Sequence, residues 1–252
     1  MRMPQLSPKR ASLARLTGAL AAAAAFALAA GGTASAAVDD DAFTRLLQLN
    51  PGLSAAELER SMREAAATTG LTYDKAIMTA LAEAESHARS GGSAGTQSDP
   101  STCNRVYVGT AAYKGDIFYS ASSTYGVSHG HTGIYSERAW ITEARGSGDL
   151  SGEFYYSGRQ YCSKIEKMFV STSQTNRDSA GNYASAYLTG KPYNSNFAWN
   201  KGGDISTLNC SELVYKAYKR SVNIDLDGDG GLGVYPNDIK NSSLTVTYSV
   251  IG

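Results

Sequence analysis

The sequence predicts an α+β protein in which a helical region precedes a sheet-forming one. Three observations support this class. Residues 37–90 show the three- and four-residue apolar spacing of helices. From Arg105 onward the chain changes to short segments of β-branched and aromatic residues, and a further helix follows at Cys210. Strands in a contiguous run, with a few helices beside them, are typical of α+β rather than alternating α/β folds.

The first 36 residues have the form of a secretory signal peptide. Four basic residues precede and border an apolar run at 16–30, and Ala34-Ser35-Ala36 has the small-x-small pattern of a cleavage site. The apolar run is shorter than the ~20 residues that span a bilayer. We therefore expect a secreted protein that begins at Ala37 and has no stable membrane insertion after cleavage.

The remaining chain divides into a helical region at 37–90, a linker at 91–100 and a larger domain at 101–252. The linker prediction rests on the small, polar composition of the segment around Gly91-Gly92-Ser93. In the helical region, Ser54 and Glu57 form a capping box and Gly70 ends the helix that follows. A third helix runs from about Tyr73 to His87, and we interpret His87 as a surface residue that caps its C-terminal end.

The charge of the mature chain argues against nucleic acid as a partner. The whole chain has 23 basic and 23 acidic residues, and all four charges of the signal segment are basic. Removing the signal leaves a net charge near −4 without a cluster of Lys and Arg, whereas phosphate-binding domains carry a basic surface.

Cys210 opens a helix whose buried face is formed by residues at helical spacing, Leu213, Val214, Ala217 and Tyr218. Ser211 or Asn209 can cap this helix. The free N–H groups and the positive end of the helix dipole favour an anion, and hence a nucleophilic thiolate, at this position. The alternative is a buried structural cysteine.

Three cysteines in an exported chain allow one disulfide and leave one thiol. If Cys210 is the nucleophile, Cys103 and Cys162 are the natural pair. The sequence also allows the alternatives, which are three free thiols or a bridge between Cys210 and one of the other two cysteines.

A catalytic thiol needs a base and a group that orients the base, and His131 and Glu143 can supply them. Strands at 131–135 and 139–144 are close enough to form a hairpin through Ser136-Glu137-Arg138. This pairing brings Glu143 to within about a residue of the level of His131. A competing interpretation is a zinc site that uses His129, His131 and Cys210.

Five segments follow one another in a fixed order: KGDIF (114–118), GHTGIY (130–135), EA (143–144), GKPY (190–193) and NCSELV (209–214). In this order they resemble the permuted papain-like amidase family, the YiiX/YycO-like members of the NlpC-type cysteine hydrolase superfamily. The resemblance covers residues 101–252. It implies a circularly permuted papain-like fold with Cys210 as nucleophile, His131 as base and Glu143 as its orienting residue. Tyr193 matches a tyrosine that the superfamily often places near the nucleophile, and packing explains this residue as well.

Asp225, Asp227 and Asp229 form the D-x-D-x-D-G opening of a calcium-binding loop. The twelfth position is Pro236 instead of the glutamate of an EF-hand. The pattern therefore predicts either a structural calcium ion or an Asp/Gly turn, and no cofactor is required for the chemistry.

Together these features predict a secreted cysteine hydrolase that cleaves peptide or isopeptide bonds in peptidoglycan-type peptides of the cell envelope. Two alternatives are a lipid acyl hydrolase or acyltransferase that uses the same residues, and a secreted binding module without activity. The sequence does not specify an oligomeric state.

Overall fold

The computed structural model describes residues 36–90, 103–121, 123–124, 127–128 and 130–252. The expected signal segment (all but its last residue), the expected linker at 91–100 and His129 lie outside the described residues. The predicted boundaries between these parts therefore stay predictions.

Three helices form the N-terminal part of the described chain: α1 (Ala36–Gln48), α2 (Ala55–Thr69) and α3 (Tyr73–Ser90). The capping box of α2 is present, because Ser54 Oγ accepts from Glu57 N while the Glu57 carboxylate accepts from Ser54 N. Gly70 ends α2 in the left-handed conformation that favours glycine. These local signals were predictable because each involves residues close together in the sequence.

A six-stranded antiparallel sheet is the centre of the larger region, which confirms the α+β class. Its spatial order is β10-β9-β2-β5-β6-β7, and every neighbouring pair is antiparallel. The strands are β2 (Ile117–Ser120), β5 (His131–Glu137), β6 (Trp140–Glu143), β7 (Gly152–Tyr155), β9 (Ile165–Val170) and β10 (Thr245–Ile251).

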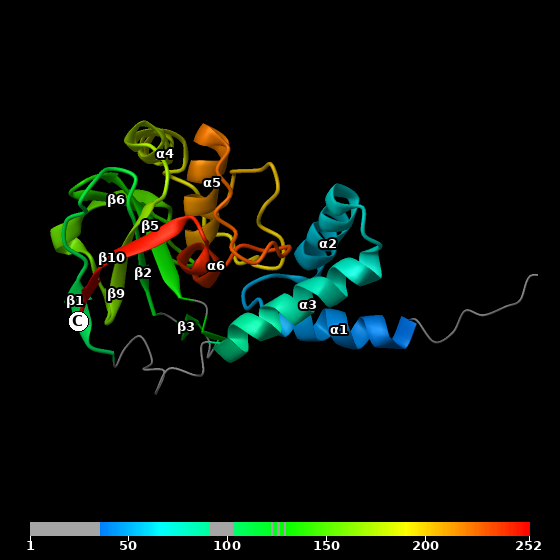
Figure 1. Ribbon diagram of the computed structural model, residues 1–252. Coiled ribbons are helices and arrows are strands. Elements are labelled where there is room, and N and C mark those ends of the chain that lie inside the picture. The colour runs from blue at the N-terminus through cyan, green and yellow to red at the C-terminus, as the bar shows by residue number, and fades with distance from the viewer. Residues whose placement is uncertain (1–35, 91–102, 122, 125–126, 129) are drawn as a thin grey trace, which may run out of the picture. The chain divides into compact units, whose positions relative to one another are not determined.

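Two helices pack side by side against one face of this sheet (Figure 1): α4 (Gln174–Tyr187) and α5 (Cys210–Val222). Ile117, Ile134 and Met168 of the sheet share a core with the apolar faces of both helices. Alternate residues of the strands serve a second core on the opposite face, which contains Phe118 and Tyr135. Strand β5 therefore contributes to both cores, with Ile134 on one face and Tyr135 on the other.

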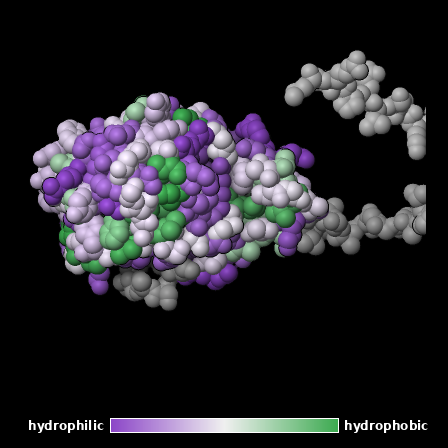
Figure 2. All heavy atoms as spheres, turned by 45° about the horizontal axis from the view of Figure 1, so that its top comes forward, coloured by the Kyte–Doolittle hydropathy of each residue, from purple (hydrophilic) through white to green (hydrophobic). Residues whose placement is uncertain are grey.

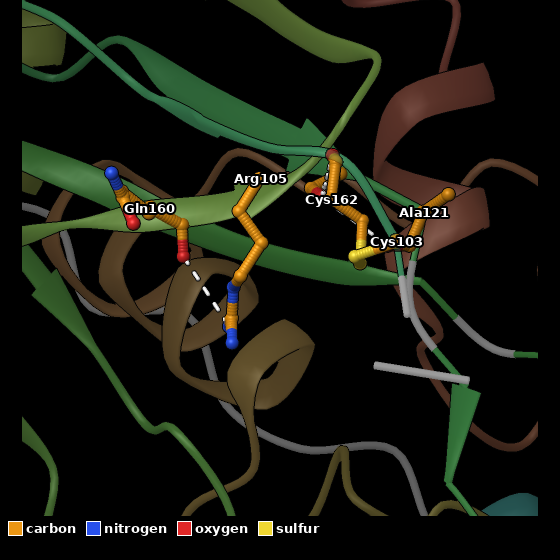
Figure 3. Close-up of a disulfide and its surroundings, with 6 residues drawn as sticks. Cys103, Arg105, Ala121, Gln160 and Cys162 are labelled. Atoms are coloured by element: carbon orange, nitrogen blue, oxygen red, sulfur yellow. Dashed lines mark hydrogen bonds between the residues drawn. A yellow bond between two sulfur atoms is a disulfide. The ribbon is translucent and has the colours of Figure 1, made fainter. Parts of the chain in front are cut away.

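A second, two-stranded sheet pairs β1 (Arg105–Tyr107) with β8 (Gln160–Cys162). The disulfide between Cys103 and Cys162 joins its two strands, as expected, and Arg105 Nη2 donates to Gln160 O beside it (Figure 3). The same strand is held to the main sheet, because Ser120 Oγ at the end of β2 donates to Cys162 O. Disulfides are typical of proteins folded in oxidising compartments.

Several short elements complete the described structure. They are β3 (Ser123–Thr124), β4 (Val127–Ser128), the 3₁₀ turn η1 (Tyr156–Gly158) and α6 (Pro236–Asn241). These elements, and also β7 and β8, were not predicted from the sequence. Helix α4 begins after Ser173, whose hydroxyl accepts from Asn176 N and caps the helix.

The three N-terminal helices share their core with two segments of the larger region. Ala198, Trp199 and Leu232 are buried among Leu58, Met62 and other residues of the helices. Asn50 adds a polar connection, because its Oδ1 accepts from Phe197 N at 2.9 Å while its Nδ2 donates to Leu46 O at 2.9 Å. The helices therefore extend the hydrophobic core of the chain.

The surface is mixed in polarity on the face drawn in Figure 2, where hydrophobic residues form small groups separated by hydrophilic ones. Among the residues that the structure describes, no helix has both the length and the apolar character needed to cross a membrane.

We predict that Asn50→Ala lowers the free energy of unfolding by about 1–3 kcal/mol, because Phe197 N–H loses its acceptor in a buried position. Urea denaturation monitored by circular dichroism measures this change. Asn241→Ala, at an exposed position of α6, is the control and should change it by less than about 0.5 kcal/mol. Equal effects of the two substitutions would contradict the role given to Asn50.

Candidate active site

The start of α5 is a buried capping box that fixes the position of Cys210. Asn209 Oδ1 accepts from Glu212 N at 2.9 Å, and Glu212 Oε2 accepts from Asn209 N at 3.1 Å. Asn209 is therefore the cap, and Ser211 instead donates its hydroxyl to Val234 O. Cys210 is the first residue of the helix, and its thiol is free and 1% exposed.

The predicted hairpin between β5 and β6 presents His131 and Glu143 on one face. Ile134 pairs with Thr142, and continuing this register places Glu143 opposite Gly133, two residues from His131 on the same side. His131 Nε2 lies 2.7 Å from Glu143 Oε2. Gly133 makes room for this contact, since a Cβ atom there would lie 2.7 Å from Phe118 Cε1 and 3.1 Å from Glu143 Cβ.

His131 also hydrogen-bonds with the Cys210 thiol, so that it lies between the sulfur and the carboxylate. Burial alone would lower the pKa of His131, but the hydrogen bonds with Cys210 and Glu143 and their negative charges raise it to about 10. The imidazole is thus held in its protonated form near neutral pH. Its side chain is 12% exposed and packs against Phe118 and Tyr161, with ring centroids 5.7 and 5.4 Å away.

Glu143 is completely buried, and two residues that were not predicted from the sequence hold it in place. Tyr161 OH donates to Glu143 Oε2 at 2.7 Å, and Arg159 Nη2 lies 2.6 Å from Oε1. Burial raises the pKa of Glu143, but the hydrogen bond and charge of His131, the charge of Arg159 and the Tyr161 hydroxyl outweigh it, and the pKa lies below its ordinary value. One indirect signal in the sequence could have pointed to Arg159 and Tyr161, namely that both lie within three positions of Cys162.

Tyr193 lies close enough to Cys210 for their charges to interact. Burial raises the pKa of Tyr193 well above its ordinary value, and the neighbouring Cys210 raises it further. The residue pairs with Leu208 in a short parallel bridge and packs against the core beneath α4 and α5. Its phenol therefore stays protonated beside the thiol, where it can donate a hydrogen bond.

The three aspartates of the expected calcium loop face different partners. Asp225 Oδ2 lies 3.1 Å from Lys219 Nζ, and Asp227 is paired with Lys201. Asp229 instead belongs to a cluster with His87. Calcium at these three residues stays a prediction, and the two lysine contacts do not favour it.

The interpretation of His87 as a surface residue is wrong. His87 is 8% exposed, and its ring stacks on Tyr235 with centroids 4.0 Å apart. The helix pattern around His87 did not predict this burial, because the covering residues come from a loop about 150 positions later.

The zinc alternative at His129, His131 and Cys210 includes a residue outside the described ranges.

A polar pocket of about 310 Å³ lies beside α2 and the segment that precedes α5. Glu57, Arg60, Asn194, Trp199 and Lys216 are among its lining residues, whereas Cys210 and His131 are not. The pocket is therefore separate from the thiol.

Comparison with known proteins places the chain in a family. No family profile matches it. A relative named "Uncharacterized protein YycO", from Bacillus subtilis (strain 168), is 35% identical over 182 residues, which cover 72% of this chain and 69% of the relative. The described part of the chain is an α+β domain with an antiparallel sheet. At this identity and coverage, the chain belongs to the YycO-like family.

A solved structure is also similar, titled "Crystal structure of metalloprotein yiiX from Escherichia coli O157:H7, DUF1105". It has 15% sequence identity and a TM-score of 0.39, and the match covers 54% of this chain and 96% of that one.

We predict that the pKa of His131 is lower in Cys210→Ala than in the wild-type chain, because the substitution removes a hydrogen bond and a charge that raise it. A titration of the imidazole signals by NMR measures the change. His87 serves as an internal control, since it contacts none of the three residues and its signal should titrate alike in both chains. An unchanged His131 pKa would contradict the contact.

The same raised pKa makes the stability of the folded chain depend on pH. The contribution of charged His131 is complete below pH 6.5, the ordinary value, and is lost as the pH rises through about 10. This loss should be smaller in Cys210→Ala, as measured by urea denaturation across that range.

We predict that Tyr161→Phe lowers the free energy of unfolding by about 1.5–3 kcal/mol, because it removes a hydrogen bond to a buried carboxylate. Tyr155→Phe is the matched control, since that ring is 46% exposed and should change the value by less than about 0.5 kcal/mol. Urea denaturation at pH 7 compares the two. Equal stabilities would show that the Tyr161 hydroxyl does not support Glu143.

Proposed function

We propose that this protein is a secreted cysteine hydrolase that cleaves amide bonds in peptides of the cell envelope. The observation that supports it best is the placement of His131 between the Cys210 thiol and the Glu143 carboxylate. This is the arrangement of nucleophile, base and orienting group that acyl transfer by a thiol needs.

In the proposed reaction, the Cys210 thiolate attacks the carbonyl carbon of the scissile amide. The C–N bond then breaks as the His131 imidazolium donates its proton to the leaving amine, and the acyl group stays on sulfur. Water next attacks the thioester and gives a proton to His131, and the C–S bond breaks to release a carboxylic acid. The backbone N–H of Cys210 at the start of α5 is one donor to the oxyanion.

Glu143 has an orienting role in this scheme. Its hydrogen bond fixes the ring of His131 through Nε2, which leaves the other nitrogen to face the thiol. Arg159 and Tyr161 keep Glu143 ionised and in place, so they act as positioning residues. We assign to Tyr193 a contact with the substrate, because the family resemblance places a tyrosine near the nucleophile and burial keeps this phenol protonated.

The wider assignment is part of the same proposal. We infer that the fold is the circularly permuted papain-like arrangement of the NlpC-type superfamily, in which the histidine precedes the cysteine along the chain. Export follows from the signal-like N-terminus and is supported by the Cys103–Cys162 disulfide. Export also determines the substrate class, because peptidoglycan-type peptides with amide or isopeptide bonds lie outside the cell membrane.

The proposal is tested with purified protein and peptidoglycan-type peptides, by following the amines released. Cys210→Ala should lower kcat/KM by at least about a thousandfold while circular dichroism stays unchanged. Glu143→Gln should lower it by about a hundredfold or more, since the glutamine cannot stabilise the imidazolium. Glu137→Gln is the matched control, because Glu137 is exposed at the other end of the same hairpin and should leave turnover unchanged.

Undiminished turnover in Cys210→Ala would refute the assignment of the nucleophile. Fatty-acid release from phospholipid vesicles that depends on Cys210, without release of amines from peptides, would favour the lipid acyl hydrolase. Absence of both activities in the wild-type chain, together with binding of peptidoglycan, would favour a binding module.

A further inference from the structure

A second group of titratable side chains lies outside the candidate active site. It is found where α3 meets α6 and the loop that precedes α6. Glu83 and His87 are one turn apart on α3, Asp229 comes from the loop before α6, and Asp238 is in the first turn of α6. One ligand-type atom from each of the four residues lies within 4.8 Å of the other three. None of these residues belongs to the candidate active site, so a role for this group does not depend on the proposed function.

His87 is directed into this group with a nitrogen that has no hydrogen-bond partner. The side chain is buried, and Nε2 makes no hydrogen bond. Nε2 lies 3.3 Å from Asp238 Oδ1 and 3.7 Å from Asp229 Oδ2. The stacking of its ring on Tyr235 holds it in this direction. A buried polar atom without a partner costs free energy, and a ligand between it and the carboxylates would recover that cost.

The carboxylates are each held from behind by backbone N–H groups, as is usual for metal ligands. Asp238 Oδ2 accepts from Tyr235 N at 2.7 Å, and Asp229 Oδ1 accepts from Gly231 N at 2.9 Å. The oxygens left over, Asp238 Oδ1 and Asp229 Oδ2, are the ones nearest His87 Nε2.

Glu83 is cradled in the same way by the loop. Its Oε2 accepts from Leu232 N at 2.7 Å, and its Oε1 accepts from Gly233 N at 3.1 Å. Gly231 permits this approach, because a Cβ atom there would collide with the Glu83 carboxylate.

Three carboxylates and one imidazole meet in this group. The nearby lysine, Lys201, is bound to Asp227 and to Gly231 O. A divalent cation would balance the remaining carboxylates in the ionised form.

We propose that Glu83, His87, Asp229 and Asp238 form a binding site for a divalent transition-metal ion, with zinc as the best match. Four donors of mixed nitrogen and oxygen type suit zinc, which binds imidazole and carboxylate at about 2.0–2.2 Å. In a tetrahedral site such donors lie about 3.3 Å apart, close to the distance between His87 Nε2 and Asp238 Oδ1. Calcium and magnesium take oxygen ligands, so an imidazole in the set disfavours them.

The role of this site is structural. An ion held by two residues of α3 and two of the later loop ties the N-terminal helices to the segment that carries α6. It also explains the third aspartate of the D-x-D-x-D-G motif, which contributes to a site different from the calcium loop that the sequence suggested.

The test is zinc binding to the full mature chain, measured by isothermal titration calorimetry after removal of bound metal. We expect one zinc ion per chain in the wild type and in Glu85→Gln, the matched control, because Glu85 is on the same helix and pairs with Arg45 and Arg89 instead. His87→Gln and Glu83→Gln should weaken binding by about a hundredfold or more. Calcium added alone should give no comparable binding.

Two further measurements keep the test decisive if a variant folds poorly. In the wild-type chain with ¹⁵N-labelled histidine, zinc should shift the His87 nitrogen signal, and Cys210→Ala should bind zinc as the wild type does. Zinc should also raise the Tm of the wild type and of Glu85→Gln but not that of His87→Gln. The proposal is overturned if His87→Gln binds zinc like the wild type, if Cys210→Ala abolishes binding, or if the His87 signal does not move.

Discussion

The buried charge of Glu143 is the constraint on which the candidate site depends. A carboxylate with no exposed surface is costly unless its oxygens are hydrogen-bonded and its charge is balanced. Three residues meet this requirement together: His131 from β5, Tyr161 from β8 and Arg159 from the turn directly before β8. Because each of these residues also has to stay where Glu143 needs it, the carboxylate fixes the geometry of the imidazole that faces Cys210.

The N-terminal end of α5 and the C-terminal part of α3 each hold buried polar side chains, and they do so in different ways. At α5, the capping box of Asn209 and Glu212 sets Cys210 at the first position of a buried helix. At α3, Glu83 and His87 lie near the C-terminal end and reach the loop at 229–238 instead of solvent. The first arrangement places the proposed nucleophile, and the second connects two distant parts of the chain.

Local signals in the sequence predicted much of the fold. The capping box at Ser54, the end of α2 at Gly70 and the β5–β6 hairpin each depend on residues within a few positions of one another. The pairing of His131 with Glu143 followed from the hairpin as well. The partners of Glu143 did not, because Tyr161 lies in strand β8 and Arg159 directly before it, and β8 is placed by pairing with β1 some fifty residues earlier. His87 was misinterpreted for the same physical reason, since its burial is produced by Tyr235 and the late loop.

The order of the site residues along the chain has a consequence for biogenesis. The hairpin with His131 and Glu143, the two side chains that hold the carboxylate and both cysteines of the disulfide all precede Cys210. During synthesis from the N-terminus, the polypeptide therefore supplies the histidine, the carboxylate and the residues that hold it before Cys210 is added. The thiol is the last of these site residues to join the chain.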